Sequence, residues 1–342
     1  MDQHHSDLAH EVILLNFGGP TQSAEVEPFL RRLFDDPFII RARIPASFRA
    51  MLARRIAKKR APKAAAEYAE IGFSPINRLT EIQARLLESE LRKRRPNTRV
   101  RVCNRYTAPF ADDVVKELDP EKTRLFLLTL YPHFCHSTTV SSIRDFDQAF
   151  ERHHGHRDVP SVRVFSWWHH ARYLTHTFER LSSAMAKALQ QDLKAPLSIV
   201  FSAHGIPTRY DQRGDPYVIE IKGHFTEMRR RGEAWLKTFD GGKHVGRVHW
   251  QLSFQSRVGP VEWVKPYTEV TLAELGKSRG GQALLVPVSF TSDHIETLYE
   301  MDHTYRNLAL ASGFISYSRA VPSNDDPELA ACLAEILDGH GF

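Results

Sequence analysis

One histidine and four carboxylates lie close together in Thr291–Asp302, the stretch TSDHIETLYEMD. In an α-helix, Asp293, Glu296 and Glu300 would follow i, i+3, i+7 spacing and share one face. Acids on one face raise each other's pKa, so they need a cation, a proton or a basic partner. The stretch could equally be an ordinary solvated helix face. We expect a site, because it begins where the apolar run Ala283–Phe290 ends, and ligands of open α/β sheets bind beyond strand ends.

A second candidate, His204, follows the apolar run Leu197–Phe201, and Gly205 predicts a turn that aims the imidazole away from the strand. A lone histidine can also be structural. A neutral imidazole accepts a proton or ligates a divalent metal at pH 7, and carboxylates add oxygen ligands. Since both follow strand ends, a parallel sheet would bring His204 and Glu296 together. One histidine with acids is too few soft ligands for a structural zinc site, so we expect a metal held briefly.

The elements that must position these residues follow an alternating pattern, which predicts parallel βαβ units. We predict eight strands, at Val12–Leu15, Val100–Cys103, Leu125–Leu130, Val162–Phe165, Leu197–Phe201, Val248–Leu252, Ala283–Val288 and Phe314–Tyr317. The main helices predicted between them are Ile76–Arg95, Thr138–Phe150, Ala171–Leu193 and Pro216–Phe239. The fold class is therefore α/β, with two Rossmann-like, doubly wound domains. Each has a parallel four-stranded sheet flanked by helices, and we expect an active-site cleft between them.

The domain boundary is expected near Arg157–Pro160, which gives a first domain of residues 1–160 and a second of residues 161–319. Apolar residues recur at helical spacing in Asp325–Leu337, after the linker at Pro322. We expect residues 320–342 to pack back on the first domain.

Composition narrows the class of protein. The 342 residues are 42% hydrophobic and 25% charged, which is typical of a globular protein. The three cysteines are far apart with no C-x-x-C pair, so they predict no disulfide framework and fit a reducing compartment. Residues 1–12 lack a signal-peptide pattern, and no stretch approaches ~18 apolar residues. We therefore expect a cytoplasmic protein without a transmembrane span.

The formal net charge of +5 is unevenly spread, because residues 41–60 hold eight Lys and Arg and no acid. Apolar residues such as Phe38, Phe48 and Met51 accompany them. A basic helix with an apolar face can lie on an anionic membrane or hold an anionic ligand, and an ordinary surface helix can look the same. We expect no nucleic-acid binding, because interleaved aromatics and a binding motif are both missing.

The strand ends of the first domain carry glycines, arginines and aromatic residues. The run Ile13–Pro20 ends in two glycines, which would let a ligand approach the backbone, but it matches neither the dinucleotide fingerprint nor a Walker A loop. Other strand ends supply Asn104–Tyr106, Tyr131–His133 and Trp167–Trp168. Such residues suit a flat, apolar ligand with acidic substituents, although core packing explains each aromatic equally well.

Seven motifs occur along the chain: LLNFGGP at Leu14–Pro20, GFSPIN at Gly72–Asn77, NRY at Asn104–Tyr106, YPHFCHSTTVSS at Tyr131–Ser142, FSAHGIP at Phe201–Pro207, FQSRVGPVEWVKP at Phe254–Pro266 and SDHIETLYEMD at Ser292–Asp302. In order and spacing they resemble the ferrochelatase family from Val12 to Ser318. The resemblance implies a lyase that inserts ferrous iron into a porphyrin during haem biosynthesis.

The resemblance also implies roles for individual residues. It places a metal site between His204 and Glu296, with Glu300 and Asp293 as further catalytic residues. Residues expected to bind the porphyrin are Ser74, Arg105, Tyr106, Phe17 and His294. A porphyrin must lose two pyrrole protons as the metal enters, so the site needs a base and ligands that release the metal. We expect His204 to accept a proton and the acids to pass protons or iron.

Departures from the family pattern limit these expectations. Only Cys332 lies near the carboxyl terminus, where some members hold a cysteine-ligated cluster, so we predict no [2Fe–2S] cluster and no cofactor beyond the substrate Fe²⁺. Phe73 and Val140 stand where glycine is common in the family. The basic stretch falls at the family's pocket lip, which favours peripheral membrane contact.

Several alternatives stay open. Protoporphyrin IX is the expected substrate, and coproporphyrin III is the alternative. A chelatase for another tetrapyrrole and a non-catalytic haem or metal carrier also share this architecture. No interface helix stands out in the sequence, so we expect a monomer.

Overall fold

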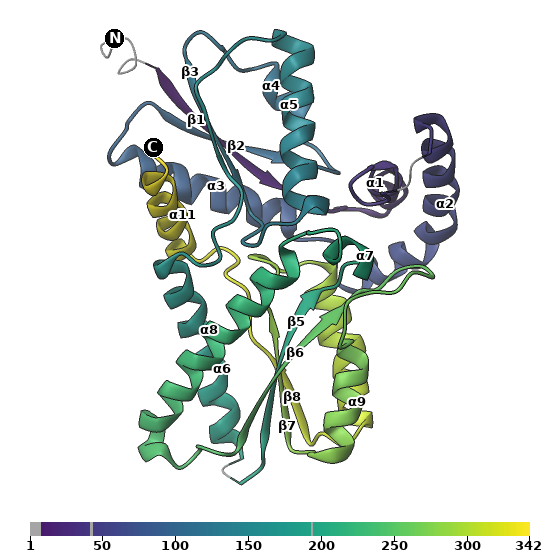
Figure 1. Ribbon diagram of the computed structural model, residues 1–342, viewed down its shortest axis with the longest axis vertical. Helices are drawn as coiled ribbons and strands as arrows, with labels where there is room; N and C mark the ends of the chain where they lie inside the picture. Colours follow the sequence, from purple (N-terminus) through teal and green to yellow (C-terminus); the bar gives the residue numbers. More distant parts are fainter. Residues whose placement is uncertain (1–7, 42–43, 193) are drawn as a thin grey trace. The chain divides into compact units, whose positions relative to one another are not determined.

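The computed structural model describes residues 8–41, 44–192 and 194–342. Predictions that fall on residues 1–7, Arg43 and Leu193 therefore lie outside the described residues. The chain divides into two compact units. Unit 1 comprises Met1–Trp167 and Asn324–Phe342, and unit 2 comprises Trp168–Ser323. Figure 1 labels the helices and strands of both.

Unit 1 is built on a four-stranded parallel sheet in the order β2-β1-β3-β4. Its strands are β1 (Ala9–Asn16), β2 (Thr98–Asn104), β3 (Thr123–Thr129) and β4 (Ser161–Val164). The central strand β1 is apolar and buried along most of its length, because helices cover both faces of a parallel sheet.

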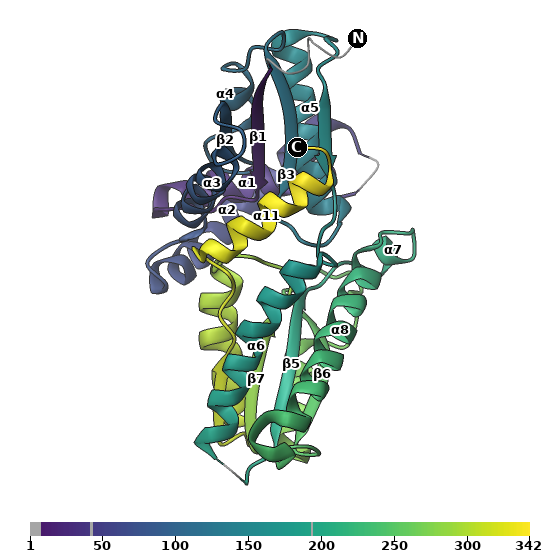
Figure 2. The same cartoon turned by 90° about the vertical axis from the view of Figure 1, so that its left-hand side faces the viewer.

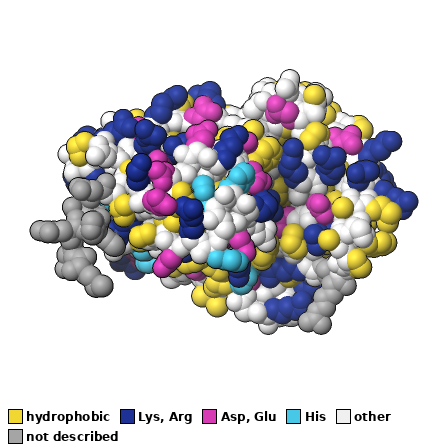
Figure 3. All heavy atoms as spheres, turned by 90° about the horizontal axis from the view of Figure 1, so that it is seen from above, with side chains coloured by type: hydrophobic (Ala, Val, Ile, Leu, Met, Phe, Trp, Pro, Cys, Tyr) yellow, Lys and Arg dark blue, Asp and Glu magenta, His cyan; other side chains and the backbone are white. Residues whose placement is uncertain are grey.

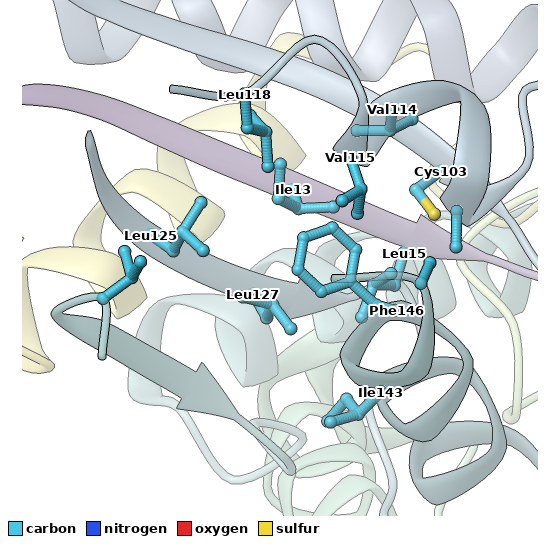
Figure 4. Packing of buried hydrophobic residues seen from close by; sticks show 13 residues of the cluster. Ile13, Leu15, Cys103, Val114, Val115, Leu118, Leu125, Leu127, Ile143 and Phe146 are labelled. Carbon is cyan, nitrogen blue, oxygen red and sulfur yellow. The ribbon is translucent and has the colours of Figure 1, made fainter. Parts of the chain in front are cut away.

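The helices of unit 1 cover this sheet and extend beyond it. They are α1 (Ser23–Asp35), α2 (Ala46–Glu70), α3 (Ile76–Arg92), α4 (Ala111–Val115), the π-helix η1 (His136–Val140), α5 (Ser141–His154) and α11 (Pro327–Gly339). Figure 4 shows Ile13 and Leu15 of β1 packed against Phe146 of α5 in the core of this unit. Figures 1 and 2 show α11 beside α3, and Gln83 of α3 donates to the carbonyl of Asn324 at 2.5 Å.

Unit 2 repeats this plan, with a parallel sheet in the order β6-β5-β7-β8. Its strands are β5 (Leu197–His204), β6 (Val248–Gln255), β7 (Gln282–Pro287) and β8 (Ser316–Arg319). Its helices are α6 (Ala171–Gln191), α7 (Thr208–Asp211), α8 (Tyr217–Thr238), the 3₁₀-helix η2 (Phe239–Gly242), α9 (Thr268–Ser278), the π-helix η3 (Glu296–Tyr305) and α10 (Arg306–Ala311).

The predicted fold class of two four-stranded parallel sheets flanked by helices is confirmed. The strand order reverses between β1 and β3 in unit 1 and between β5 and β7 in unit 2. Such a reversal leaves a crevice at the carboxyl ends of the two strands, where α/β proteins bind ligands. In each unit a π-helix follows the strand on one side of this crevice, η1 after β3 and η3 after β7.

The boundary between the units lies after Trp167 rather than at Arg157–Pro160. The reason is β4, which pairs in parallel with β3 and therefore belongs to the sheet of unit 1. Trp167 then donates its indole N–H to the carbonyl of Thr129 at 2.8 Å. At the other end, unit 1 resumes at Asn324 rather than at residue 320, because the Ala320 N–H still bonds the Leu285 carbonyl of unit 2 at 2.8 Å.

Among the described residues, no helix is both long enough and apolar enough to cross a membrane.

Candidate active site

His204 is the last residue of β5, so the strand runs three residues further than the Leu197–Phe201 run predicted. The strand continues because Ala203 and His204 still pair with Phe254 and Gln255 of β6. The Gly205 N–H then donates to the Gln255 carbonyl at 2.9 Å. A Cβ on Gly205 would lie only 3.0 Å from that oxygen, so a larger residue would push the Gln255 backbone away by a few tenths of an ångström.

Glu296 begins η3, beyond the end of the neighbouring strand β7, and it contacts His204 directly. The imidazole Nδ1 lies 2.9 Å from Oε2 and 3.0 Å from Oε1 of Glu296. Because an ionised carboxylate only accepts, Nδ1 is the donor. The described residues give the other ring nitrogen, Nε2, no hydrogen-bond partner, and 36% of the His204 side chain is exposed. Nε2 is therefore the atom that remains for a proton or a metal.

The contact shifts the pKa of both groups in opposite directions. Burial alone would lower the pKa of His204, but the charge and hydrogen bond of Glu296, and then the charge of Glu300, raise it. Burial alone would raise the pKa of Glu296, but the charge and hydrogen bond of His204 outweigh that effect and lower it. The pair is therefore stabilised as imidazolium and carboxylate.

Further donors hold Glu296 from the end of β6. The Gln255 amide and the Ser256 hydroxyl each lie 3.1 Å from its Oε2. The same hydroxyl lies 2.6 Å from Oε2 of Glu300. A hydroxyl has one hydrogen, so Ser256 donates to one of these carboxylates at a time and can accept from the other when that carboxyl is protonated. His204, Glu296, Ser256 and Glu300 thus form a continuous hydrogen-bonded chain.

The acids of the Thr291–Asp302 stretch do not share one face, which corrects the sequence prediction. Asp293 and His294 lie before any helix, and from Glu296 onward the chain forms the π-helix η3 instead of an α-helix. Glu296 and Glu300 both contact Ser256. Asp293 instead pairs with Arg319 of β8, whose Nη1 lies 2.9 Å from its Oδ1. The Arg319 guanidinium balances the charge of Asp293. The expected role of Asp293 in passing protons or iron stays a prediction.

His294 lies on the other side of Glu296 and is buried. Its Nε2 is 3.8 Å from Oε1 of Glu296, and its Nδ1 is 3.1 Å from the Ser292 carbonyl. Its ring lies 3.9 Å from the ring of Phe290 between centroids. His294 therefore borders the Glu296 carboxylate.

The remaining predicted site residues belong to unit 1, where a buried carboxylate that the sequence analysis did not single out organises two of them. Asp36 accepts from the Tyr106 hydroxyl at 2.7 Å and pairs with Nη2 of Arg105 at 3.0 Å. Tyr106 is fully buried, and 18% of the Arg105 side chain is exposed. Ser141 also donates to Asp36. In the sequence, the position of Asp36 directly after α1 is the one feature that could have singled it out.

Phe17 and Ser74 complete the predicted set. Phe17 is half-buried and packs edge-to-face on Tyr106, with ring centroids 4.6 Å apart. Ser74 is buried beside Gly19, where a Cβ would meet its hydroxyl at 2.4 Å. A Cβ on Gly18 would similarly meet Thr107. The two glycines therefore make room for these protein side chains, and the close approach of a ligand to their backbone stays a prediction.

Within the described part of the chain, no group of three or more His, Cys, Asp or Glu side chains is arranged to hold a metal ion. His204 and Glu296 offer two donors of mixed type, which suits a metal that passes through. Cys103, Cys135 and Cys332 are all buried. The absence of an iron–sulfur cluster stays a prediction.

Comparison with known proteins shows which family the chain resembles. The family model described as Ferrochelatase matches residues 10–340. A ferrochelatase from Synechococcus sp. (strain RCC307) is 39% identical over 337 residues, covering 96% of this chain and 81% of that protein. One from Synechocystis sp. (strain ATCC 27184 / PCC 6803 / Kazusa) is 38% identical over 334 residues, covering 95% and 81%.

A plant relative, Ferrochelatase-2, chloroplastic, from Cucumis sativus, is 38% identical over 341 residues, covering 95% of this chain and 62% of that protein. One solved structure, SirB from Bacillus subtilis with Fe3+, is a distant match, with a TM-score of 0.47 and 9% identity over 98% of this chain and 96% of that chain. The match of the family model along almost the whole sequence and the identity to these relatives show that this chain belongs to the ferrochelatase family.

Proposed function

We propose that this chain is a ferrochelatase, a lyase that inserts ferrous iron into a porphyrin in haem biosynthesis. The observation that carries the proposal is the contact of 2.9 Å between His204 and Glu296, continued through Ser256 to Glu300. It gives a base at the carboxyl end of β5 and a route for protons away from it. Family membership supplies the reaction, and these residues supply a means of performing it.

The reaction exchanges two pyrrole N–H protons of the porphyrin for one Fe²⁺. The neutral imidazole is the form of His204 that can accept a pyrrole proton at Nε2, and Glu296 stabilises the imidazolium that forms, as in other histidine–carboxylate pairs. The imidazolium then gives its Nδ1 proton to Glu296. The protonated Glu296 passes it on through Ser256, whose hydroxyl oxygen accepts that proton while its own hydrogen moves to Glu300. The transfers from His204 to Glu300 run between atoms already in contact. The second pyrrole proton can follow once Nε2 is free of its proton again and Glu300 has released the first.

The same two residues can also meet the iron, which is a substrate here. An imidazole nitrogen and a carboxylate oxygen suit Fe²⁺, and a pair of donors leaves most of its coordination sphere to water or to the porphyrin nitrogens. A site with more protein ligands would hold the metal more tightly and slow its transfer. The order in which His204 and Glu296 engage the metal is open to kinetic test.

For the porphyrin, we propose contacts from Phe17 and Arg105 of unit 1, because both side chains keep exposed surface. An apolar ring face and a guanidinium would suit a flat macrocycle with carboxylates. Tyr106 and Ser74 are buried, so their expected part is to support Phe17 and Arg105 from within unit 1, and His294 is buried beside Glu296 in unit 2. Protoporphyrin IX is the proposed substrate, with coproporphyrin III as the alternative.

We further propose that the protein is a cytoplasmic monomer that touches a membrane peripherally through α2. Phe48 and Met51 on this helix are 50% and 42% exposed among its lysines and arginines. Figure 3 shows Lys and Arg side chains gathered with hydrophobic ones on the side of unit 1 that bears α2. Apolar side chains among cations fit the interface of an anionic bilayer.

The test is an anaerobic absorbance assay of Fe²⁺ or Zn²⁺ insertion into protoporphyrin IX and coproporphyrin III. We expect multiple turnovers by the wild type and losses of at least about 100-fold in kcat for His204→Ala and Glu296→Ala. Glu233→Ala is the control, because Glu233 lies on the exposed surface of α8 and pairs there with Arg229. Porphyrin binding without metal insertion would instead identify a carrier. Full activity in both site variants would show that the site is misassigned.

A further inference from the structure

Arg319, the last residue of β8, reaches both ends of the acidic segment around η3. Its Nε and Nη2 lie 2.8 and 2.9 Å from the two carboxylate oxygens of Asp302, inside the π-helix. Its Nη1 lies 2.9 Å from Asp293, which precedes the helix. The Arg319 side chain is only 8% exposed. One buried guanidinium therefore joins the segment before Glu296 to the segment after Glu300.

Tyr317 adds a second contact from the same strand. It lies two residues before Arg319, so both side chains share one face of β8. The Tyr317 hydroxyl donates to the carbonyl of Met301 at 2.7 Å. That carbonyl also accepts the Arg306 N–H, five residues further along, which is the bond that defines a π-helix. Tyr317 therefore supports η3 at a hydrogen bond of its π register.

The register matters because it decides where the two glutamates point. A π-helix is less stable than an α-helix and is mostly seen as a single turn, whereas η3 spans ten residues. Reverting to α-helical bonds would rotate Glu300 relative to Glu296. The Ser256 hydroxyl, now 3.1 Å from one and 2.6 Å from the other, would lose at least one of these contacts.

We infer that Arg319 is a positioning residue: by holding Asp293 and Asp302 together it keeps η3 in the π register and so keeps Glu296 and Glu300 on Ser256. Its planar fork binds both oxygens of Asp302 and still has a donor for Asp293, an arrangement that a lysine ammonium cannot reproduce. The functional part of this inference rests on the proposed reaction, whereas the effect on the helix does not.

The experiment compares Arg319→Lys, which keeps the charge but loses the fork, with Tyr317→Phe, which removes one hydroxyl and should fold in any case. Arg247→Lys is the matched control. Arg247 is another arginine of unit 2, but it bonds the carbonyls of Asp192 and Ala195 near the start of β6, at the opposite end of the sheet. Each variant is assayed for kcat, for KM of protoporphyrin IX, for its melting temperature and for hydrogen–deuterium exchange of residues 296–306.

We expect Arg319→Lys to lower kcat about tenfold or more with KM changed less than about twofold, the pattern of a misplaced catalytic group. Its amides in residues 296–306 should exchange at least about tenfold faster than in Arg247→Lys. Tyr317→Phe should show both effects in weaker form. Unchanged exchange in this segment, or losses of kcat equal to those of Arg247→Lys at a matched loss of melting temperature, would overturn the inference. Failure of the wild type to insert metal would reject the proposed function alone, since exchange still reports on the helix.

Discussion

Ser256 occupies a backbone conformation that serine rarely adopts. Its φ is +62°, in the left-handed region, where a residue with a Cβ is less stable by about 1–2 kcal/mol. Strain of this kind persists where the surroundings over-determine it, often at functional sites. Here the strained backbone places the hydroxyl between Glu296 and Glu300. The strained backbone of Ser256 lowers stability, and in return its hydroxyl contacts both carboxylates.

Substitutions of Ser256 can separate the effect of its hydroxyl on activity from the effect of its backbone strain on stability. Ser256→Ala and Ser256→Gly both remove the hydroxyl, so we expect each to lower kcat about tenfold or more, as proton passage between the glutamates is interrupted. Only the glycine relieves the strain. Ser256→Gly should therefore be more stable than Ser256→Ala by about 1 kcal/mol in chemical denaturation. Wild-type kcat in both variants would show that protons leave by another route.

Among the elements, the turn between α2 and α3 contains a second strained residue. Phe73 has a φ of +67°, which explains why glycine is common at this place in the family pattern. Val140, the other departure, has a φ of −69° inside η1 and bears no such strain. One departure is thus costly to the backbone and the other is not.

We expect Phe73→Gly to be more stable than Phe73→Ala by about 1 kcal/mol, because both lose the ring but only glycine suits a positive φ. Urea denaturation of the two variants measures the difference. The same pair of substitutions at Val140 is the control, and there alanine should be the more stable by about 1 kcal/mol. Equal stability of the two Phe73 variants would mean that the turn relaxes to a conformation suited to L-residues.

Helix α2 allows the membrane proposal to be tested at the scale of the element. Its cations and its exposed Phe48 and Met51 should bind vesicles that contain an anionic phospholipid. Pelleting should be strong at low salt and fall as ionic strength rises, because exposed charges are screened. Phe48→Ser should weaken it at all salt concentrations, whereas Val245→Ser, an exposed apolar position of unit 2, should not. No pelleting at low salt would exclude this role.

The elements also show what sequence reasoning can reach. The strands were predictable because fully buried parallel strands read as continuous apolar runs, and His204 and Glu296 came together because they follow adjacent strands. The π-helix was not predictable, since the same residues suit an α-helix. Its supports, Arg319 and Tyr317, come from a strand more than ten residues away. Ser256 lies in the motif at Phe254–Pro266, but the sequence did not show its role, because that role depends on φ.

At the scale of the whole molecule, each unit buries a histidine outside the site whose pKa lies well below the ordinary value. Burial, and then Arg95 and Arg124, lowers the pKa of His10 in unit 1 to about 4. Burial, and then Arg231, lowers the pKa of His224 in unit 2 to about 4. Both histidines titrate near 6.5 once unfolded. Below pH 6.5 the unfolded chain therefore binds more protons than the folded one. The free energy of unfolding decreases as the pH is lowered from about 6.5 to about 4.

The two histidines should each remove about 2 kcal/mol of stability between roughly pH 7 and pH 5. Urea denaturation at the two pH values measures this loss. In His224→Phe, beside Trp168, and in His10→Phe, beside Phe126, the loss should shrink by about that amount. The two histidines lie in different units. If the two units unfold in separate transitions, each substitution should reduce the pH dependence of the transition of its own unit. A pH dependence identical to that of the wild type would mean that neither group governs acid stability.

The shared plan of the two units offers a use beyond this chain. Both carry the same strand order and a π-helix after the strand that borders the reversal, but η1 reads His136–Val140, HSTTV, whereas η3 contains Glu296 and Glu300. One molecule thus contains two π-helices at corresponding places in the two sheets, one with carboxylates and one without them. An engineer who grafts carboxylates onto η1 can learn how much of a metal-handling site comes from backbone shape and how much from the residues placed on it.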